Sequence, residues 1–194
     1  MTYNLLKFFH ILGAILMGAG LVVVWLADMR SRQLRELSTF AEAVRTIAVC
    51  YDGLVVPGSL LLLVSGAWMI AQYYGGLNFL QVPWLAGMVA LFLAEFIEGN
   101  TVTRLYFVRL LRLTRQSLQV GRFISELEHE RGKLVPSFTH FLDLPALTLI
   151  IALGTLKPDT WLLWWVGVIT ALAISSLLTY WIPRIYPWGA QTAS

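Results

Sequence analysis

Long apolar stretches recur along the chain and are separated by short polar segments. Five of them are long enough to cross the hydrocarbon core of a bilayer, which is roughly 30 Å thick and needs about 20 helical residues. They are Leu5–Ala27, Ile47–Tyr74, Pro83–Asn100, Phe138–Leu156 and Trp161–Ile182. The two-residue alternation of membrane-barrel strands is not visible. The pattern therefore predicts an all-α fold, a polytopic transmembrane helical bundle that forms one domain over residues 1–194.

The polar segments carry helical patterns of their own. Thr39-x-x-Glu42 is a capping-box pattern, so we expect a helix that begins near Thr39 and continues into the second span. Pro57 should kink that span. Residues 101–121 place arginines among leucines, which is typical of a basic helix lying on the bilayer surface. Ser125–Lys133 has mixed charges and predicts a solvated turn.

Composition and charge support a membrane protein. Apolar residues make up 58% and charged residues 13% of the chain, against roughly 45–50% and about 25% in soluble domains, which excludes a soluble enzyme. Twelve of the 14 basic residues lie between spans one and two, between spans three and four, or after span five; only Lys7 and Lys157 lie on the other side. The positive-inside rule then predicts a bacterial-type inner (plasma) membrane protein with its N-terminus outside and its C-terminus in the cytoplasm.

His10 is the first candidate ligand, because an ionisable group inside a span is costly and marks a functional site. Its helical face continues through Gly13, Ala14, Met17 and Gly18. Small residues beside a histidine leave room for a flat, broad group such as a haem. The alternative is that Ala14-x-x-x-Gly18 forms a close helix–helix contact, with His10 hydrogen-bonded across it.

A second set of ionisable residues lies toward the predicted cytoplasmic side. Glu95 and Glu98 share a helical face, and His140 and Asp143 share another. The whole set comprises Asp28, Asp52, Glu95, Glu98, His140 and Asp143, with Arg45 and Arg104 close enough in sequence to pair with them. Such groups relay protons or hold a polar head group, or else they form a structural network of salt bridges. We expect them to be mutually satisfied.

The two membrane histidines are predicted to lie in separate sites. His10 lies near the outer face and His140 near the inner face, roughly 15–20 Å apart in depth. Met69, Met88 and Lys157 lie at the depth of His10. Methionine can serve as a second axial haem ligand, so the sixth position of a haem iron on His10 would be one of these residues or empty. Because no CxxCH motif is present, any haem is expected to be non-covalent.

Three segments resemble known membrane proteins. Leu6–Gly13 (LKFFHILG) is similar to the first helix of the CopD and HemJ superfamily, and Phe141–Leu147 (FLDLPAL), followed by Lys157-Pro158, is similar to a HemJ-type helix. Closer still is an uncharacterised family of predicted integral membrane proteins, a domain of unknown function allied to that superfamily. Its resemblance rests on Asp52, Pro57 and the stretch Ser65–Trp68 (SGAW). The resemblance covers roughly residues 5–158 and implies a four-helix unit with one added span.

The resemblance implies a cofactor and a chemistry. HemJ-type proteins bind haem b and act as protoporphyrinogen oxidases, and CopD-type proteins are linked to copper handling. His10 would be the ligand of the haem iron, and Lys157 matches the motif lysine. HemJ-type proteins also have a third-helix histidine, where this chain has Glu95, Glu98 and Gly99. The resemblance therefore leaves open whether this chain is a protoporphyrinogen-oxidase-like oxidoreductase.

The resulting hypothesis is an integral membrane haem b protein that performs electron transfer or porphyrin-linked redox chemistry. Its partners would be the lipid bilayer and a quinone, a porphyrin, a membrane redox protein or a second copy of the chain; nucleic acid is not expected. One alternative is a cofactor-free structural or regulatory membrane subunit. Another is a copper-handling membrane protein.

Overall fold

The computed structural model describes residues 2–187, and every regular element in this part of the chain is helical. In chain order these are α1 (Thr2–Gln33), α2 (Leu37–Cys50), η1 (Tyr51–Val55), α3 (Val56–Tyr73), η2 (Gly76–Gln81), α4 (Pro83–Glu98), η3 (Gly99–Thr103), α5 (Arg104–Val120), α6 (Ser125–Arg131), α7 (Leu134–Leu156) and α8 (Leu162–Ile185). The predicted all-α fold is therefore confirmed.

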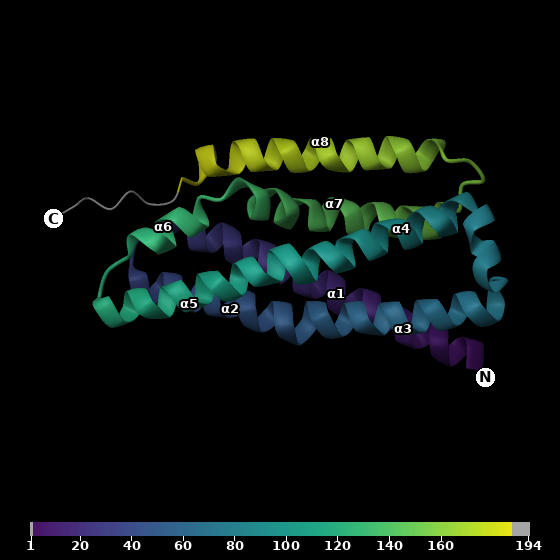
Figure 1. Ribbon diagram of the computed structural model, residues 1–194, viewed down its shortest axis with the longest axis horizontal. Coiled ribbons are helices and arrows are strands. Elements are labelled where there is room, and N and C mark those ends of the chain that lie inside the picture. Colours follow the sequence, from purple (N-terminus) through teal and green to yellow (C-terminus); the bar gives the residue numbers. More distant parts are fainter. Residues whose placement is uncertain (1, 188–194) are drawn as a thin grey trace.

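Five long helices are apolar enough to cross a membrane, as predicted. Two of them are composite: α2, η1 and α3 form one helix over Leu37–Tyr73, and α4, η3 and α5 form another over Pro83–Val120. The elements η1 and η3 are single π-helical turns. The long helices lie side by side along the longest axis, and α1 begins at the end opposite to the one where α8 finishes (Figure 1). An odd number of crossings gives this arrangement.

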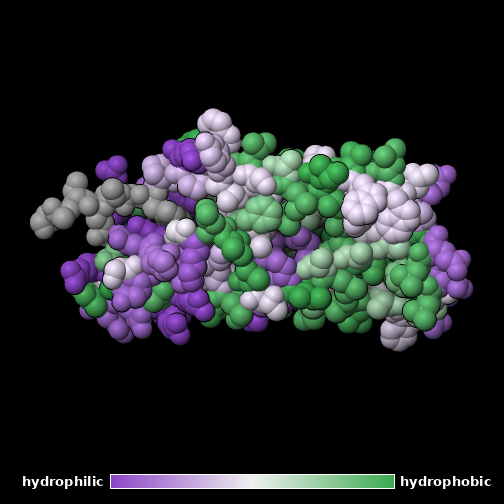
Figure 2. Space-filling view, turned by 45° about the horizontal axis from the view of Figure 1, so that its top comes forward, coloured by the Kyte–Doolittle hydropathy of each residue, from purple (hydrophilic) through white to green (hydrophobic). Residues whose placement is uncertain are grey.

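The surface matches a membrane-spanning bundle with one hydrophilic end. Large apolar side chains such as Ile15, Val64 and Ile169 are more than half exposed along the middle of the bundle. Hydrophilic residues gather at the end occupied by α5 and α6, whereas apolar residues cover most of the remaining surface in this view (Figure 2). We call the hydrophilic end the basic end, because exposed arginines such as Arg112, Arg115 and Arg122 lie there.

Close contact between α1 and α3 depends on glycines in both helices. A Cβ atom on Gly58 would lie 2.5 Å from the backbone nitrogen of Met17, and one on Gly13 would lie 2.9 Å from the carbonyl oxygen of Gly58. Small residues let membrane helices approach closely enough for backbone packing. At Gly13 the small-residue face of α1 is therefore filled by α3, whereas Gly18 lies toward Leu147 of α7.

Two expectations for the segments at the basic end were wrong. Residues 101–121 do not form a separate surface helix, because α5 continues the third span and buries its apolar face: Phe107 and Leu110 share a core with Val44 and Ile47 of α2. Nor is Ser125–Lys133 a solvated turn. It contains α6, which buries Leu127 completely in that same core.

The start of the second long helix also differs from the prediction. The helix begins at Leu37, and the carboxylate of Glu36 accepts hydrogen bonds from the hydroxyls of Ser38 (2.5 Å) and Thr39 (3.0 Å). Thr39 is therefore not the capping residue. The helix continues into the second span, as expected, and the π-turn η1 lies immediately before the turn that contains Pro57.

Candidate functional site

Three carboxylates converge between α4 and α7. Glu95 and Glu98 come from the last turn of α4, and Asp143 comes from the middle of α7. One ligand oxygen from each lies within 4.8 Å of the other two. We call these three residues the acidic triad. Glu95 and Glu98 share a face of their helix as the spacing predicted, and the packing of α4 on α7 adds Asp143.

Both π-turns lie beside the acidic triad. The hydroxyl of Tyr51, in η1, donates a hydrogen bond of 2.9 Å to the carbonyl oxygen of Gly99, in η3. A Cβ atom on Gly99 would lie 2.8 Å from that hydroxyl, so glycine permits the contact. π-turns within α-helices are rare and occur frequently at functional sites.

The hydrogen bonds of the acidic triad are incomplete. Glu98 accepts a bond of 2.7 Å from the hydroxyl of Thr103, which is 3.0 Å from the hydroxyl of Thr139. The other oxygen of Glu98 and the Oδ2 of Asp143 are buried without a hydrogen-bond partner. The expectation that these groups are mutually satisfied is therefore met only in part: His140 lies beside Asp143, but i, i+3 spacing supplies no donor for these two oxygens.

No arginine or lysine within residues 2–187 forms an ion pair with the acidic triad. Arg104 instead binds Asp52 at 2.7 Å, and both side chains are about half exposed. Arg45 pairs with Glu42 at the surface. Asp52 and Arg104, both predicted as members of the polar set, are thus a separate pair that joins η1 to the start of α5.

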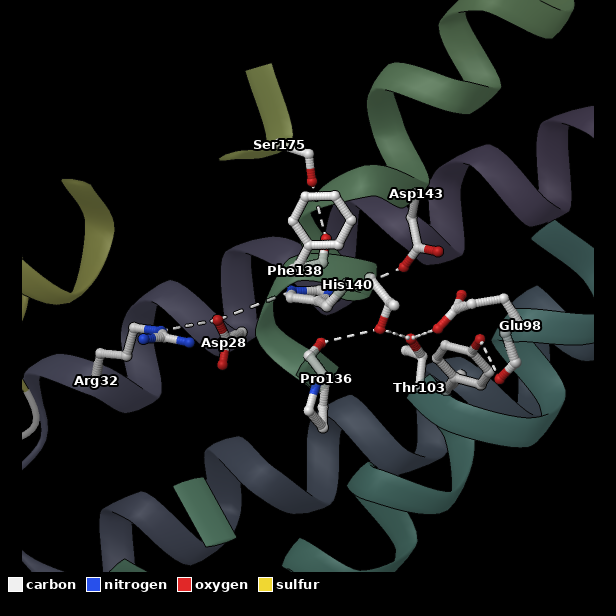
Figure 3. A network of polar contacts seen from close by, with 12 residues as sticks. Asp28, Arg32, Glu98, Thr103, Pro136, Phe138, His140, Asp143 and Ser175 are labelled. Atoms are coloured by element: carbon white, nitrogen blue, oxygen red, sulfur yellow. Dashed lines mark hydrogen bonds and ion pairs between the residues drawn. The ribbon is translucent and has the colours of Figure 1, made fainter. Parts of the chain in front are cut away.

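His140 lies between two carboxylates in the interior (Figure 3). Its side chain is 3% exposed, Nδ1 is 3.6 Å from the Oδ2 of Asp143, and Nε2 is 3.8 Å from the Oδ2 of Asp28. Neither ring nitrogen forms a hydrogen bond. The ring of Phe107 packs edge-on against the imidazole at 5.3 Å. Asp143, His140 and Asp28 thus form a continuous polar path from the acidic triad toward the basic end.

Asp28 is itself part of a buried ion pair. Its Oδ2 is 2.9 Å from the Nε of Arg32, and both side chains are 2% exposed. The sequence reasoning did not identify Arg32 as a site residue, although its i, i+4 spacing from Asp28 was a visible signal. Thr103 and Thr139 were also missed, because hydroxyl residues in helices usually bond their own backbone and give no distinct pattern.

A small cavity adjoins the acidic triad. Its volume is about 20 Å³, which is enough for one water molecule or one small ion. Besides Glu95 and Asp143, its polar wall is formed by Tyr51, Ser59, Gly99 and Asn100.

His10 lies in a different environment, at the α1–α3 contact. Its Nδ1 is 3.0 Å from the hydroxyl of Ser65. That hydroxyl has one proton and donates it to the carbonyl oxygen of Leu61 in a short hydrogen bond. The hydroxyl must then accept from Nδ1–H, which assigns the lone pair of the imidazole to Nε2. The second interpretation of this face matches the geometry in part: His10 is hydrogen-bonded across a close helix contact, but Gly13 and not Ala14-x-x-x-Gly18 makes the close approach to α3.

The remaining predicted haem residues lie in several helix contacts. Ala14 and Met17 pack into the core beside α3. The Sδ of Met88 would be 3.2 Å from a Cβ atom on Gly154, so Met88 contacts α7. The ammonium group of Lys157 lies 5.4 Å from the ring centre of Trp84 at the start of α4. Met69 is half-buried on α3. The structure thus brings Met88 and Lys157 to the α4–α7 side, whereas His10 faces α3.

The two histidines are far apart, as predicted. His140 contacts Asp28, which follows His10 by about 18 residues on the same helix, so the two rings are separated by about 27 Å along α1. This separation is larger than the expected 15–20 Å. His10 and His140 belong to two different sites.

Comparison with known proteins identifies one family. Residues 4–158 match the family model described as predicted integral membrane protein (DUF2269). The match includes the first four long helices, His10, His140 and the acidic triad, and α8 lies outside it. No curated protein and no solved structure matches the chain significantly.

Proposed function

The chain belongs to the DUF2269 family of predicted integral membrane proteins, and from the geometry of its interior we propose that it transfers protons within the membrane. The observation that carries the proposal is the position of His140, buried between the carboxylates of Asp143 and Asp28 at 3.6 and 3.8 Å. Acids and histidines in a row inside a membrane protein are the usual parts of a proton relay.

Charge repulsion within the acidic triad favours the uptake of a proton by the relay. Three ionised carboxylates within 4.8 Å repel one another strongly in a region of low dielectric constant. A proton on one of them reduces that repulsion. When the proton moves from Asp143 to Nδ1 of His140, the carboxyl group becomes a carboxylate and the ring becomes an imidazolium. Asp28 then stabilises the imidazolium from the Nε2 side.

Proton flux into liposomes tests this proposal. The purified protein is reconstituted with a trapped pH dye, and a potassium gradient with valinomycin drives proton entry. His140→Gln should reduce the flux to that of protein-free liposomes, whereas the matched control His129→Gln, in an exposed position on α6, should leave it unchanged. Equal flux in the His140→Gln variant and the unaltered protein would contradict the relay.

The basic end gives the relay a direction. Twelve of the 14 basic residues favour a cytoplasmic position for this end. Under the proposal the N-terminus is outside, in an inner (plasma) membrane, and Asp28 lies on the cytoplasmic side of His140. A phosphatase reporter fused at the C-terminus should be inactive and a cytoplasmic fluorescent reporter active. The opposite result would place the basic end and Asp28 on the outer side of the membrane.

Haem b binding at His10 is the second candidate function. It is favoured by the hydrogen bond of Nδ1 to Ser65, which leaves Nε2 as a lone-pair donor; metal-bound histidines are commonly held in this way. A bound haem would supply one-electron chemistry, for electron transfer or porphyrin-linked redox reactions with a quinone or a membrane partner. Because α3 fills the face of Gly13, that face supplies no space for the macrocycle.

An absorption spectrum of the detergent-purified protein tests the haem proposal. A Soret band should be present, should be lost in His10→Ala and should persist in His140→Ala, since the two rings lie about 27 Å apart along α1. A colourless protein that still carries proton flux would contradict the haem proposal and support the cofactor-free interpretation.

A copper site would need soft ligands that converge, whereas Met17 and Met88 lie in different helix contacts.

A further inference from the structure

We infer that the acidic triad, Glu95, Glu98 and Asp143, binds one divalent metal ion of the hard, oxygen-preferring class, such as Mn²⁺, Mg²⁺ or Ca²⁺, inside the membrane. The inference deepens the proposed function and rests on it in one respect, because both concern the charge of the same buried carboxylates. It adds a ligand other than the proton to that site.

The separation of the oxygens fits a single ion. Ca²⁺ binds oxygens at roughly 2.3–2.6 Å and Mg²⁺ at roughly 2.0–2.1 Å, so two oxygens on one ion are separated by at most about 5 Å for Ca²⁺ and about 4 Å for Mg²⁺. One oxygen from each member of the triad already lies within 4.8 Å of the other two. The ligands come from α4 and α7, so an ion would join two helices without a change in the backbone.

Unpartnered oxygens on two members of the triad point to a missing ligand. The side chain of Asp143 is 7% exposed, and its Oδ2, which faces Nδ1 of His140 at 3.6 Å, accepts no hydrogen bond. Thr103 holds one oxygen of Glu98, while the other oxygen is buried without a donor. Buried polar atoms are almost always paired, so each exception requires an explanation. A cation held by the three carboxylates would supply the positive charge that these buried groups lack.

His140 provides a second, independent observation. It is 3% exposed, neither nitrogen forms a hydrogen bond, and Nδ1 faces Asp143 at 3.6 Å. A polar side chain that contacts a metal-binding carboxylate on the side away from the metal commonly fixes the orientation of that carboxylate. His140 is also the only buried basic side chain that the ion pairs of residues 2–187 place next to the triad.

Charge and space favour a divalent ion. Three carboxylates carry a charge of −3 when ionised, and Arg104, the nearest arginine in sequence, is bound to Asp52. The adjoining cavity of about 20 Å³ accommodates one water ligand. Its further donors are the oxygens of Ser59, Asn100 and Tyr51. The three charged ligands are all carboxylates, which suit Mg²⁺, Ca²⁺ or Mn²⁺ better than soft metals.

Mn²⁺ binding to the full chain tests the inference. The protein is purified in detergent, stripped with EDTA and titrated with Mn²⁺, and free Mn²⁺ is followed by its electron paramagnetic resonance signal. We expect saturation near one Mn²⁺ per chain, competition by Mg²⁺ or Ca²⁺, and a higher melting temperature with Mn²⁺. Asp143→Asn and Glu95→Gln should each weaken binding by at least about tenfold.

Glu42→Gln is the matched control, because Glu42 is an exposed carboxylate on α2 and its loss should leave the affinity unchanged. Unsaturable binding to the unaltered protein, or unchanged affinity in Asp143→Asn, overturns the inference. Should a variant fold poorly, the Mn²⁺-dependent melting shift of the unaltered protein decides: a shift supports the site, and none overturns it.

His140→Gln separates this inference from the proton relay. The variant keeps all three ligands, so Mn²⁺ binding should persist while proton flux is lost. Proton flux without any Mn²⁺ binding would overturn the metal site and leave the relay. Mn²⁺ binding with unchanged flux in His140→Gln would overturn the relay and leave the metal site.

Discussion

The α1–α3 contact and the α4–α7 contact both place ionisable side chains inside the bundle, but they treat them differently. At α1–α3, His10 bonds Ser65, which in turn bonds a backbone carbonyl, and glycines bring the helices together. At α4–α7, two carboxylate oxygens and both nitrogens of His140 lack hydrogen bonds. Complete polar pairs stabilise a contact, whereas incomplete ones destabilise it and are retained where they serve a ligand or a reaction. The α4–α7 contact is therefore the better candidate for the functional site.

The largest effect should come from breaking the α1–α3 contact. Gly58→Leu places a side chain where even a Cβ atom would lie 2.5 Å from the backbone of Met17, so the helices must separate. We expect loss of the monodisperse folded protein in size-exclusion chromatography. Gly53→Leu is the control, because Gly53 has open space around its Cβ position. Equal behaviour of the two variants would show that glycine packing does not hold this contact.

The next effect concerns the buried pair that ends the polar path. Asp28→Ala should destabilise the protein by about 3–5 kcal/mol, because it removes one partner of a fully buried ion pair. Glu42→Ala removes the partner of Arg45 in an exposed pair and should change stability by less than about 0.5 kcal/mol. Thermal unfolding in detergent measures both. Similar losses would contradict the burial of Asp28.

A smaller effect is expected within the acidic triad itself. In metal-free buffer, Glu98→Gln and Asp143→Asn each remove a charge from the same repelling group, so their effects on stability should not add. We expect a coupling free energy of about 1 kcal/mol, with the double variant gaining less than the sum of the single variants. Additive changes would show that these two carboxylates do not interact.

The smallest effect should arise at His10. Ser65→Ala removes a single hydrogen bond between α1 and α3 and should reduce stability by about 0.5–1.5 kcal/mol. If the protein binds haem, the same change should weaken binding without abolishing it, because the tautomer of the ring is no longer fixed. A loss of stability as large as that of Asp28→Ala would mean that the two contacts are not as different as the geometry indicates.

Much of the fold was predictable because the hydrophobic stretches are long. All five spans were found, and so was the separation of His10 from His140. The position of residues 101–121 was not predictable, since an amphipathic helix looks the same whether its apolar face covers lipid or protein. Only the folded structure shows that the apolar face of α5 packs on Val44 and Ile47 of α2 and not on lipid.

The candidate site was predictable in part. Spacing within one helix identified Glu95 with Glu98, and His140 with Asp143. It did not show that α4 faces α7, or that Arg104 pairs with Asp52 across 52 positions. The π-turns were invisible for a similar reason: Gly99–Thr103 carries no residue that enforces a wider helical turn, and the contact of Tyr51 with Gly99 supports it only in the folded bundle.

The two composite helices have a mechanical consequence. Each contains 37 or 38 residues, which makes a rod of about 55 Å, whereas a bilayer core is only about 30 Å thick. Both rods therefore run on beyond the bilayer. Tyr51–Gly99 joins their π-turns, and Asp52–Arg104 joins η1 to the start of α5. The 17 residues of α5 extend the lever by about 25 Å from the acidic triad. One continuous helix, Pro83–Val120, therefore joins the acidic triad to the far end of α5 at the basic end.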